Sequence, residues 1–85
     1  NLYPFEDAKK RGLAGKELIE FIDVGGPSML RAAAKNFENI CVVCDPGDYG
    51  WIARKDGQLT MEDRKYLAAK VFQWTSSYDH MIASS

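Results

Sequence analysis

The strongest pattern along the chain is a stretch in which mostly apolar residues recur every three or four positions. From Thr60 onward they fall on one side of a helix, and this stripe consists of Leu67, Val71, Trp74, Thr75, Tyr78 and Ile82. The spacing predicts the longest helix of the chain. Thr60 and Asp63 stand three positions apart at its beginning, the spacing of a capping box.

Shorter helices are predicted upstream of it. Residues 16–22 hold enough apolar side chains for about two helical turns. Residues 27–36 form a second helix, with Pro27 at its first position and Asn36 at its end. Its apolar stripe consists of Leu30, Ala33, Ala34 and Phe37. A further short helix begins with Asp45 as its N-cap, runs to about Arg54 and is followed by a turn at residues 55–57.

A short apolar run at residues 40–44 interrupts this helical pattern. It is rich in β-branched residues and predicts a strand buried on both faces, which is typical of a parallel sheet covered on both sides. Residues 1–5 look like the end of another strand because Pro4 cannot donate to a ladder, and residues 6–15 look like a surface loop. A parallel sheet needs more strands than these. We therefore expect residues 1–85 to be the C-terminal portion of an α/β, three-layer domain whose first strands lie upstream of Asn1.

Cys41 and Cys44 share that predicted strand. Residues three apart on a strand point to opposite faces, and the only histidine, His80, is distant in the sequence. We therefore expect buried, reduced thiols and no metal or disulfide site. Reduced cysteines are consistent with a cytoplasmic protein.

Composition narrows the range of functions. The 85 residues include 11 Lys and Arg against 12 Asp and Glu, a net charge of −1, which argues against a strongly basic nucleic-acid binder. Hydrophobic residues make up 46% and charged residues 27%, as in an ordinary globular chain. The longest apolar run is too short to cross a bilayer, so we expect no membrane span. A charged stretch followed by an apolar one is not seen, so we expect no secretory leader.

The segment 22–36 is the best candidate for chemistry. Its two glycines let a ligand approach the main chain, and the N–H groups at the helix start can bind an anion or a polar oxygen. Asp23 precedes this turn, and one polar helix face carries Ser28, Arg31 and Lys35. An acid, main-chain donors and cations could therefore converge. The alternative is structural: Asp23 caps a helix, Arg31 is solvated, and Lys35 offsets the helix dipole.

Four sequence motifs in order carry a family resemblance. They are N-L-Y-P-F at 1–5, I-D-V-G-G-P-S-M-L-R-A-A-A-K-N at 22–36, D-P-G-D-Y at 45–49, and L-A-A-K-V-F at 67–72 followed by Thr75, Tyr78 and Asp79. Together they resemble the bifunctional purine-biosynthesis family of aminoimidazole carboxamide ribonucleotide formyltransferase/IMP cyclohydrolase. The resemblance covers nearly the whole chain. It implies the C-terminal part of the cyclohydrolase domain, which has a methylglyoxal-synthase-like fold.

The resemblance also implies a reaction and the residues that perform it. Formylaminoimidazole carboxamide ribonucleotide, a purine nucleotide precursor, would close its ring with loss of water to give IMP, without a cofactor or metal. Asp23 would bind the attacking nitrogen and take its proton, while Lys35 and Tyr3 would donate to the formyl oxygen. The base would be held by Asn1 and by the main chain of Val24 and Gly25.

The remaining implications concern the rest of such a protein. The resemblance places a phosphate-binding loop upstream of Asn1, and a formyltransferase domain using formyl-tetrahydrofolate downstream of residue 85. It implies a cytoplasmic homodimer that binds neither nucleic acid nor membrane. Trp74 stands where the family often has histidine. Two alternatives stay open. One is a non-catalytic module of the same fold that binds a phosphorylated metabolite, and the other is a remnant that is stabilised by packing against another copy through its Trp74 face.

Overall fold

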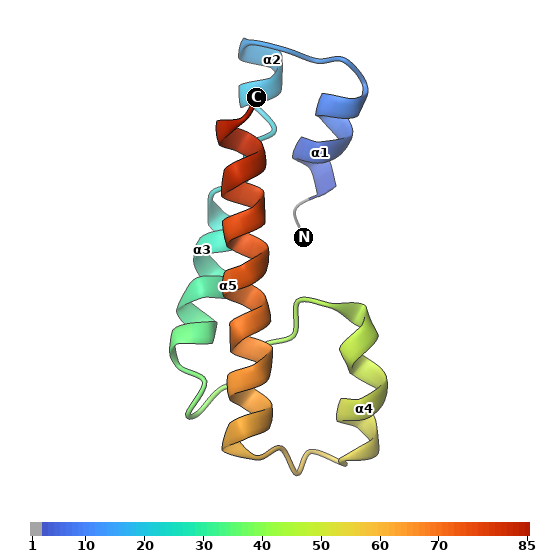
Figure 1. Ribbon diagram of the computed structural model, residues 1–85, viewed down its shortest axis with the longest axis vertical. Coiled ribbons are helices and arrows are strands. Elements are labelled where there is room, and N and C mark those ends of the chain that lie inside the picture. Colours follow the sequence, from blue (N-terminus) through green and yellow to red (C-terminus); the bar gives the residue numbers. More distant parts are fainter. Residues whose placement is uncertain (1–2) are drawn as a thin grey trace.

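The computed structural model describes the main chain of residues 3–85 and the side chains of residues 5–85, and within that range it is helical (Figure 1). Asn1 lies outside the described residues, as does the Tyr3 side chain. The elements in chain order are α1 (Tyr3–Lys10), α2 (Lys16–Ile19), α3 (Gly25–Lys35), the 3-10 helix η1 (Pro46–Asp48), α4 (Tyr49–Arg54) and α5 (Met61–Ala83).

Helix α5 runs almost the full length of the molecule, and the other elements lie along it (Figure 1). Helix α3 packs against it directly. Helices α1 and α2 lie near its C-terminal end, and α4 lies beside its N-terminal half. The result is an elongated body of 46 × 22 × 17 Å.

The predicted start and stripe of α5 are confirmed. The Thr60 hydroxyl accepts from the Asp63 N–H at 3.1 Å, and the Asp63 carboxylate accepts from the Thr60 N–H at 3.0 Å. This reciprocal pair satisfies two donors that the first helical turn leaves without partners. The side chains that α5 buries are Leu67, Ala68, Val71, Thr75 and Tyr78.

Among the described residues, two separate apolar clusters hold α1, α2 and α3 against α5. One joins α1 and α2 to its C-terminal half and consists of Phe5, Ala8, Leu18 and Tyr78. The other joins α3 to its N-terminal half and consists of Ala34, Val42, Ala68 and Val71. The radius of gyration is 15.0 Å, whereas a compact chain of this length would have about 12 Å. Residues 5–85 therefore bury two small clusters and not one shared core.

The two predicted upstream helices are present with shifted ends. Helix α3 begins two residues earlier than predicted, at Gly25, and Asn36 is its C-cap as expected. Its buried stripe faces α5 as the spacing predicted. Helix α2 is a single turn that ends at Ile19. The predicted N-cap at Asp45 is confirmed, since its carboxylate accepts from the Gly47 N–H at 2.9 Å.

The prediction of a strand end and a surface loop before residue 11 is wrong for the described residues, which form α1. Pro4 lies in the first turn of α1. N–H groups in a first helical turn have no partner within the helix, so the absence of an N–H in proline costs no hydrogen bond there. Two ion pairs at the i,i+4 spacing stabilise the helix on its exposed side. They join Glu6 with Lys10 and Asp7 with Arg11. The loop prediction holds only after Lys10.

Residues 40–44 are the main departure from the predicted elements. They are assigned neither helix nor strand, and no strand occurs anywhere in residues 3–85. A strand needs a neighbour to bond, and this part of the chain supplies none. Val42 is buried as predicted, but Cys41 is exposed, so the predicted burial of both thiols is wrong. Both cysteines are free. The parallel sheet stays a prediction.

Within the described residues, no helix has both the length and the apolar character needed to cross a membrane.

Candidate functional site

Asp23 lies in the short connection between α2 and α3, and two hydrogen bonds fix it. Its Oδ1 accepts from the Gly26 N–H at 3.0 Å. Its own N–H donates to the Tyr78 hydroxyl at 2.8 Å. Oδ2 has no hydrogen-bond partner within residues 5–85, and the side chain is half-buried. Asp23 therefore caps the first turn of α3, and one carboxylate oxygen stays available to a ligand.

Gly26 is required by this arrangement. A Cβ on residue 26 would lie 2.6 Å from Oδ2 of Asp23, closer than real contacts allow. The glycine therefore lets the carboxylate lie against the first turn of α3.

Val24 and Gly25 present the open main chain that the sequence predicted. Val24 is 70% exposed, and Gly25 is also exposed. Neither N–H has a main-chain partner in the described part of the chain, as is usual for the first donors of a helix. These groups can bind a polar oxygen beside Asp23.

Lys35 is not brought to the same place. It is exposed at the opposite end of α3, which has 11 residues, so the helix separates it from Asp23 by about 15 Å along the axis. No carboxylate pairs with it among the described side chains. Ser28 and Arg31 are exposed along the same helix. The predicted convergence of acid and cations in one small volume is not found in this structure.

Tyr78 connects the first two motifs of the sequence. Its ring meets the Phe5 ring edge-on, with centroids 6.0 Å apart and planes at 78°. Its hydroxyl accepts from Asp23, as described above. The sequence pattern assigned Tyr78 to core or interface packing and missed this second role. The available signal was chemical, because a buried tyrosine hydroxyl usually has a hydrogen-bond partner.

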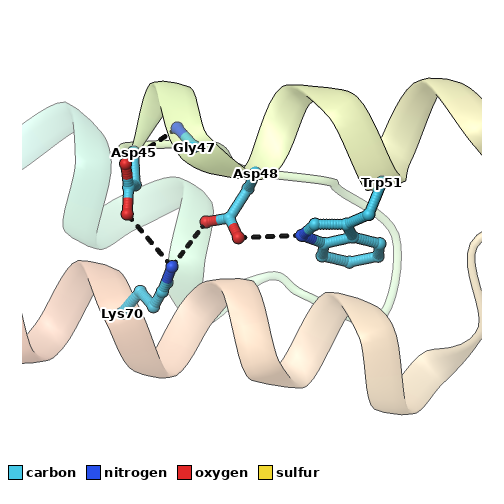
Figure 2. Close-up of polar contacts among 5 residues, drawn as sticks. All are labelled: Asp45, Gly47, Asp48, Trp51 and Lys70. Carbon is cyan, nitrogen blue, oxygen red and sulfur yellow. Dashed lines mark hydrogen bonds and ion pairs between the residues drawn. The ribbon is translucent and has the colours of Figure 1, made fainter.

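A second polar cluster lies beside the N-terminal half of α5 (Figure 2). Lys70 donates to Asp48 at 2.8 Å and to Asp45 at 3.1 Å. Asp48 is 4% exposed and also accepts from the indole N–H of Trp51 at 2.8 Å. The cluster therefore ties η1 and the start of α4 to α5.

The charges of this cluster stabilise one another. The Lys70 and Trp51 hydrogen bonds lower the pKa of Asp48. The Gly47 N–H and then Lys70 lower the pKa of Asp45. Both carboxylates raise the pKa of Lys70. Each charged group of this cluster is paired with another group of the cluster. This indicates that the cluster holds η1 and α4 against α5, and does not act in catalysis.

An open pocket of about 400 Å³ adjoins this cluster, and its wall includes Cys44, Lys70 and Trp74. Burial, followed by the nearby Asp45 charge, raises the pKa of the Cys44 thiol. A raised thiol pKa disfavours the nucleophilic thiolate. No group of three or more potential metal ligands occurs in the described residues.

Comparison with known proteins gives the family. The profile of the AICARFT/IMPCHase bienzyme matches residues 33–85. The chain is 52% identical over 87 residues to the bifunctional purine biosynthesis protein PurH of Aquifex aeolicus, covering 100% of the chain. It is 53% identical to the PurH of Leuconostoc mesenteroides over 99% of the chain, and 52% identical to that of Lactococcus lactis subsp. cremoris (strain MG1363) over 98%.

The chain spans 17% of the length of each of these relatives. The matching profile and the identity across the whole chain agree with the four motifs found in the sequence. The chain belongs to the AICARFT/IMPCHase bienzyme family.

Proposed function

We propose that this chain supplies part of the IMP cyclohydrolase site of a bifunctional purine-biosynthesis protein. The reaction is the ring closure of formylaminoimidazole carboxamide ribonucleotide to IMP with loss of water. The observation that supports it most is the geometry of Asp23: Gly26 holds the carboxylate through Oδ1, and Oδ2 has no hydrogen-bond partner among residues 5–85. The open N–H groups of Val24 and Gly25 lie next to it in the chain.

The chemistry needs a base, because the attacking carboxamide nitrogen is a weak nucleophile. Asp23 takes that proton or fixes the nitrogen by a hydrogen bond, a role in which a positioned carboxylate contributes about 100-fold or more. The neighbouring main-chain N–H groups hold the base of the nucleotide. Holding the two reacting arms together adds the proximity effect. The proposal includes no cofactor and no metal for this step.

Lys35 and Tyr3 are assigned to the formyl oxygen by the family resemblance alone. Donors aimed at a developing oxyanion each contribute about 3 kcal/mol. Because α3 separates Lys35 from Asp23, the role of Lys35 is tested separately from that of Asp23.

The proposal extends to the architecture around the site. Residues 40–44 become a strand of a parallel α/β sheet whose other strands lie outside these 85 residues. The elongated shape and the exposed large apolar side chains, such as Met29 at 75%, support further packing partners. The 5′-phosphate seat and the formyltransferase domain, with its formyl-tetrahydrofolate, belong to other parts of a cytoplasmic homodimer.

The test uses the full-length protein that carries this segment, with IMP formation followed by ultraviolet absorbance. Asp23→Ala and Lys35→Ala are each expected to lower the turnover of the formylated nucleotide by about 100-fold or more. Formyl transfer from the folate serves as an internal control for folding. The matched control is Asp7→Ala, which removes an exposed carboxylate on α1 and leaves both activities unchanged.

Turnover close to wild type in either variant contradicts the role assigned to that residue. Binding of the nucleotide by the unsubstituted protein without formation of IMP supports the alternative, a non-catalytic module for a phosphorylated metabolite. The separation of Asp23 from Lys35 is the observation that keeps this alternative open.

A further inference from the structure

We propose that Tyr78 is a positioning residue for Asp23: its hydroxyl fixes the main chain of Asp23 so that the carboxylate keeps one orientation toward the substrate. This inference rests on the proposed function, because it concerns the residue expected to act as the base. Tyr78 itself is assigned no contact with the reacting atoms.

The hydrogen bond from the Asp23 N–H to the Tyr78 hydroxyl is unlike the others around Asp23. It is 2.8 Å long and joins residues 55 positions apart. The other hydrogen bonds of this connection are local, such as Phe21 N–H to Leu18 O at 3.0 Å and Ile22 N–H to Ile19 O at 3.0 Å. Within the described residues, the bond to Tyr78 is thus the one hydrogen bond that ties the Asp23 main chain to α5.

The hydroxyl is well placed to act as a fixed point. Tyr78 is 3% exposed and lies on the buried stripe of the 23-residue helix α5. Its ring packs edge-on against Phe5, which is fully buried in the same cluster. The Phe5 contact and the long helix therefore hold the ring, and the position of the hydroxyl is fixed by the position of the ring.

Asp23 is consequently restrained on both sides of its Cα. Tyr78 holds the main-chain N–H, and the Gly26 N–H holds Oδ1. With these two bonds made, the orientation of the free Oδ2 is fixed. Loss of the tyrosine hydroxyl removes the restraint on the Asp23 main chain. The carboxylate is then held only by its hydrogen bond to the Gly26 N–H of α3.

The main test is Tyr78→Phe in the full-length protein, which keeps the ring and removes only the hydroxyl. We expect kcat for ring closure to fall on the order of 10-fold, since small misplacement of a reacting group is costly, with KM and formyl transfer little changed. The matched control is Thr75→Val, which removes another buried hydroxyl of α5; that hydroxyl donates only to Phe72 O of its own helix. The control is expected to keep wild-type kcat.

A double-mutant cycle separates positioning from general structural damage. If Tyr78 acts through the Asp23 carboxylate, Tyr78→Phe has no further effect on kcat once Asp23→Ala is present. Additive losses in the two variants overturn the proposal. Equal losses in Tyr78→Phe and Thr75→Val overturn it as well.

Amide hydrogen exchange gives a readout that does not depend on activity. In Tyr78→Phe the Asp23 amide is expected to exchange at least about 10-fold faster, while the α5 amides around residue 71 keep their protection. Unchanged exchange at Asp23 overturns the proposal, as does faster exchange with wild-type kcat. If the unsubstituted protein forms no IMP, the proposed function fails and the catalytic part of this inference fails with it. The exchange experiment still decides whether Tyr78 holds Asp23.

Discussion

At the scale of single residues, the motif D-V-G-G can be understood from a few atoms. Asp23 caps the first turn of α3, and Gly26 makes room for its carboxylate. The N–H groups of Val24 and Gly25 have no main-chain partner within the described residues. The structural interpretation of Asp23 as a cap and the catalytic interpretation are therefore compatible. The capping bond uses Oδ1, and the proposed chemistry uses Oδ2.

Gly26→Ala tests this description directly. The new Cβ would meet Oδ2 of Asp23 at 2.6 Å, so the carboxylate must move. We expect ring closure in the full-length protein to slow on the order of 10-fold, while formyl transfer is retained. The control is Gly50→Ala in α4, where the nearest atom is the flexible end of Arg54 at 3.5 Å. Unchanged ring closure in Gly26→Ala would show that the position of this carboxylate is unimportant.

The lowered pKa of Asp48 predicts that the stability of the fold depends on pH. The pKa of this carboxyl is lower in the folded chain, chiefly because Lys70 donates to it. A group of this kind stabilises the fold above its ordinary pKa of about 4 and loses that contribution as the pH falls through the depressed value. Asp48→Asn is therefore expected to be less stable than wild type at neutral pH, with the difference shrinking below about pH 4.

Urea unfolding midpoints across that pH range measure this effect. Asp56→Asn is the matched control, because Asp56 stands in an exposed turn and forms no ion pair with a described side chain. A constant difference between Asp48→Asn and wild type from neutral to acidic pH contradicts the importance of the Lys70 pair.

At the scale of elements, local signals were sufficient for α3, α5 and their caps. Thr60 with Asp63, and Asp45 before Pro46, identify helix starts because the interactions span only two or three residues. Helix α1 departs from the sequence prediction because Pro4 suits a first helical turn as well as the end of a strand.

The capping box of α5 gives a stability prediction. Thr60→Ala removes the hydroxyl that accepts from the Asp63 N–H, and we expect a loss of about 1 kcal/mol in the free energy of unfolding. Chemical denaturation measures it. Ser76→Ala, at an exposed position of the same helix, is the control and should change stability much less. Equal stabilities of Thr60→Ala and wild type would mean that packing alone fixes the start of α5.

The contacts that define the candidate site could not be predicted from spacing. The bond between Asp23 and Tyr78 spans 55 positions, and the pair Asp48 and Lys70 spans 22. Such contacts depend on how α5 is packed against the rest of the chain. Sequence periodicity identified the buried face of α5 but not the partner of each polar group on it.

At the scale of the whole molecule, the shape indicates that packing is incomplete in these 85 residues. In the part of the chain that the structure describes, two small apolar clusters hold α1, α2 and α3 against α5, and the radius of gyration exceeds that of a compact chain. Residues 40–44 carry the composition of a buried strand without a neighbouring strand in the described part of the chain. We propose that this segment is completed by a parallel sheet in the full-length protein.

Thiol labelling tests the proposed sheet. Cys41 is exposed in this chain, but a strand covered on both faces would bury it. We expect a maleimide to modify Cys41 in the full-length protein at least about 10-fold more slowly than an exposed reference thiol. The reference is introduced by Ser76→Cys on α5. Equal labelling rates would contradict a buried strand at residues 40–44.

We propose that this chain supplies the base of a cyclohydrolase site whose phosphate-binding residues lie elsewhere in the protein. The most direct measurement is IMP formation from the formylated ribonucleotide by the chain alone and by the chain mixed with the part of the protein preceding it. We expect product only in the mixture, and none when the chain in the mixture carries Asp23→Ala. Product from the chain alone, or no product from a mixture shown to be folded, would contradict the proposal.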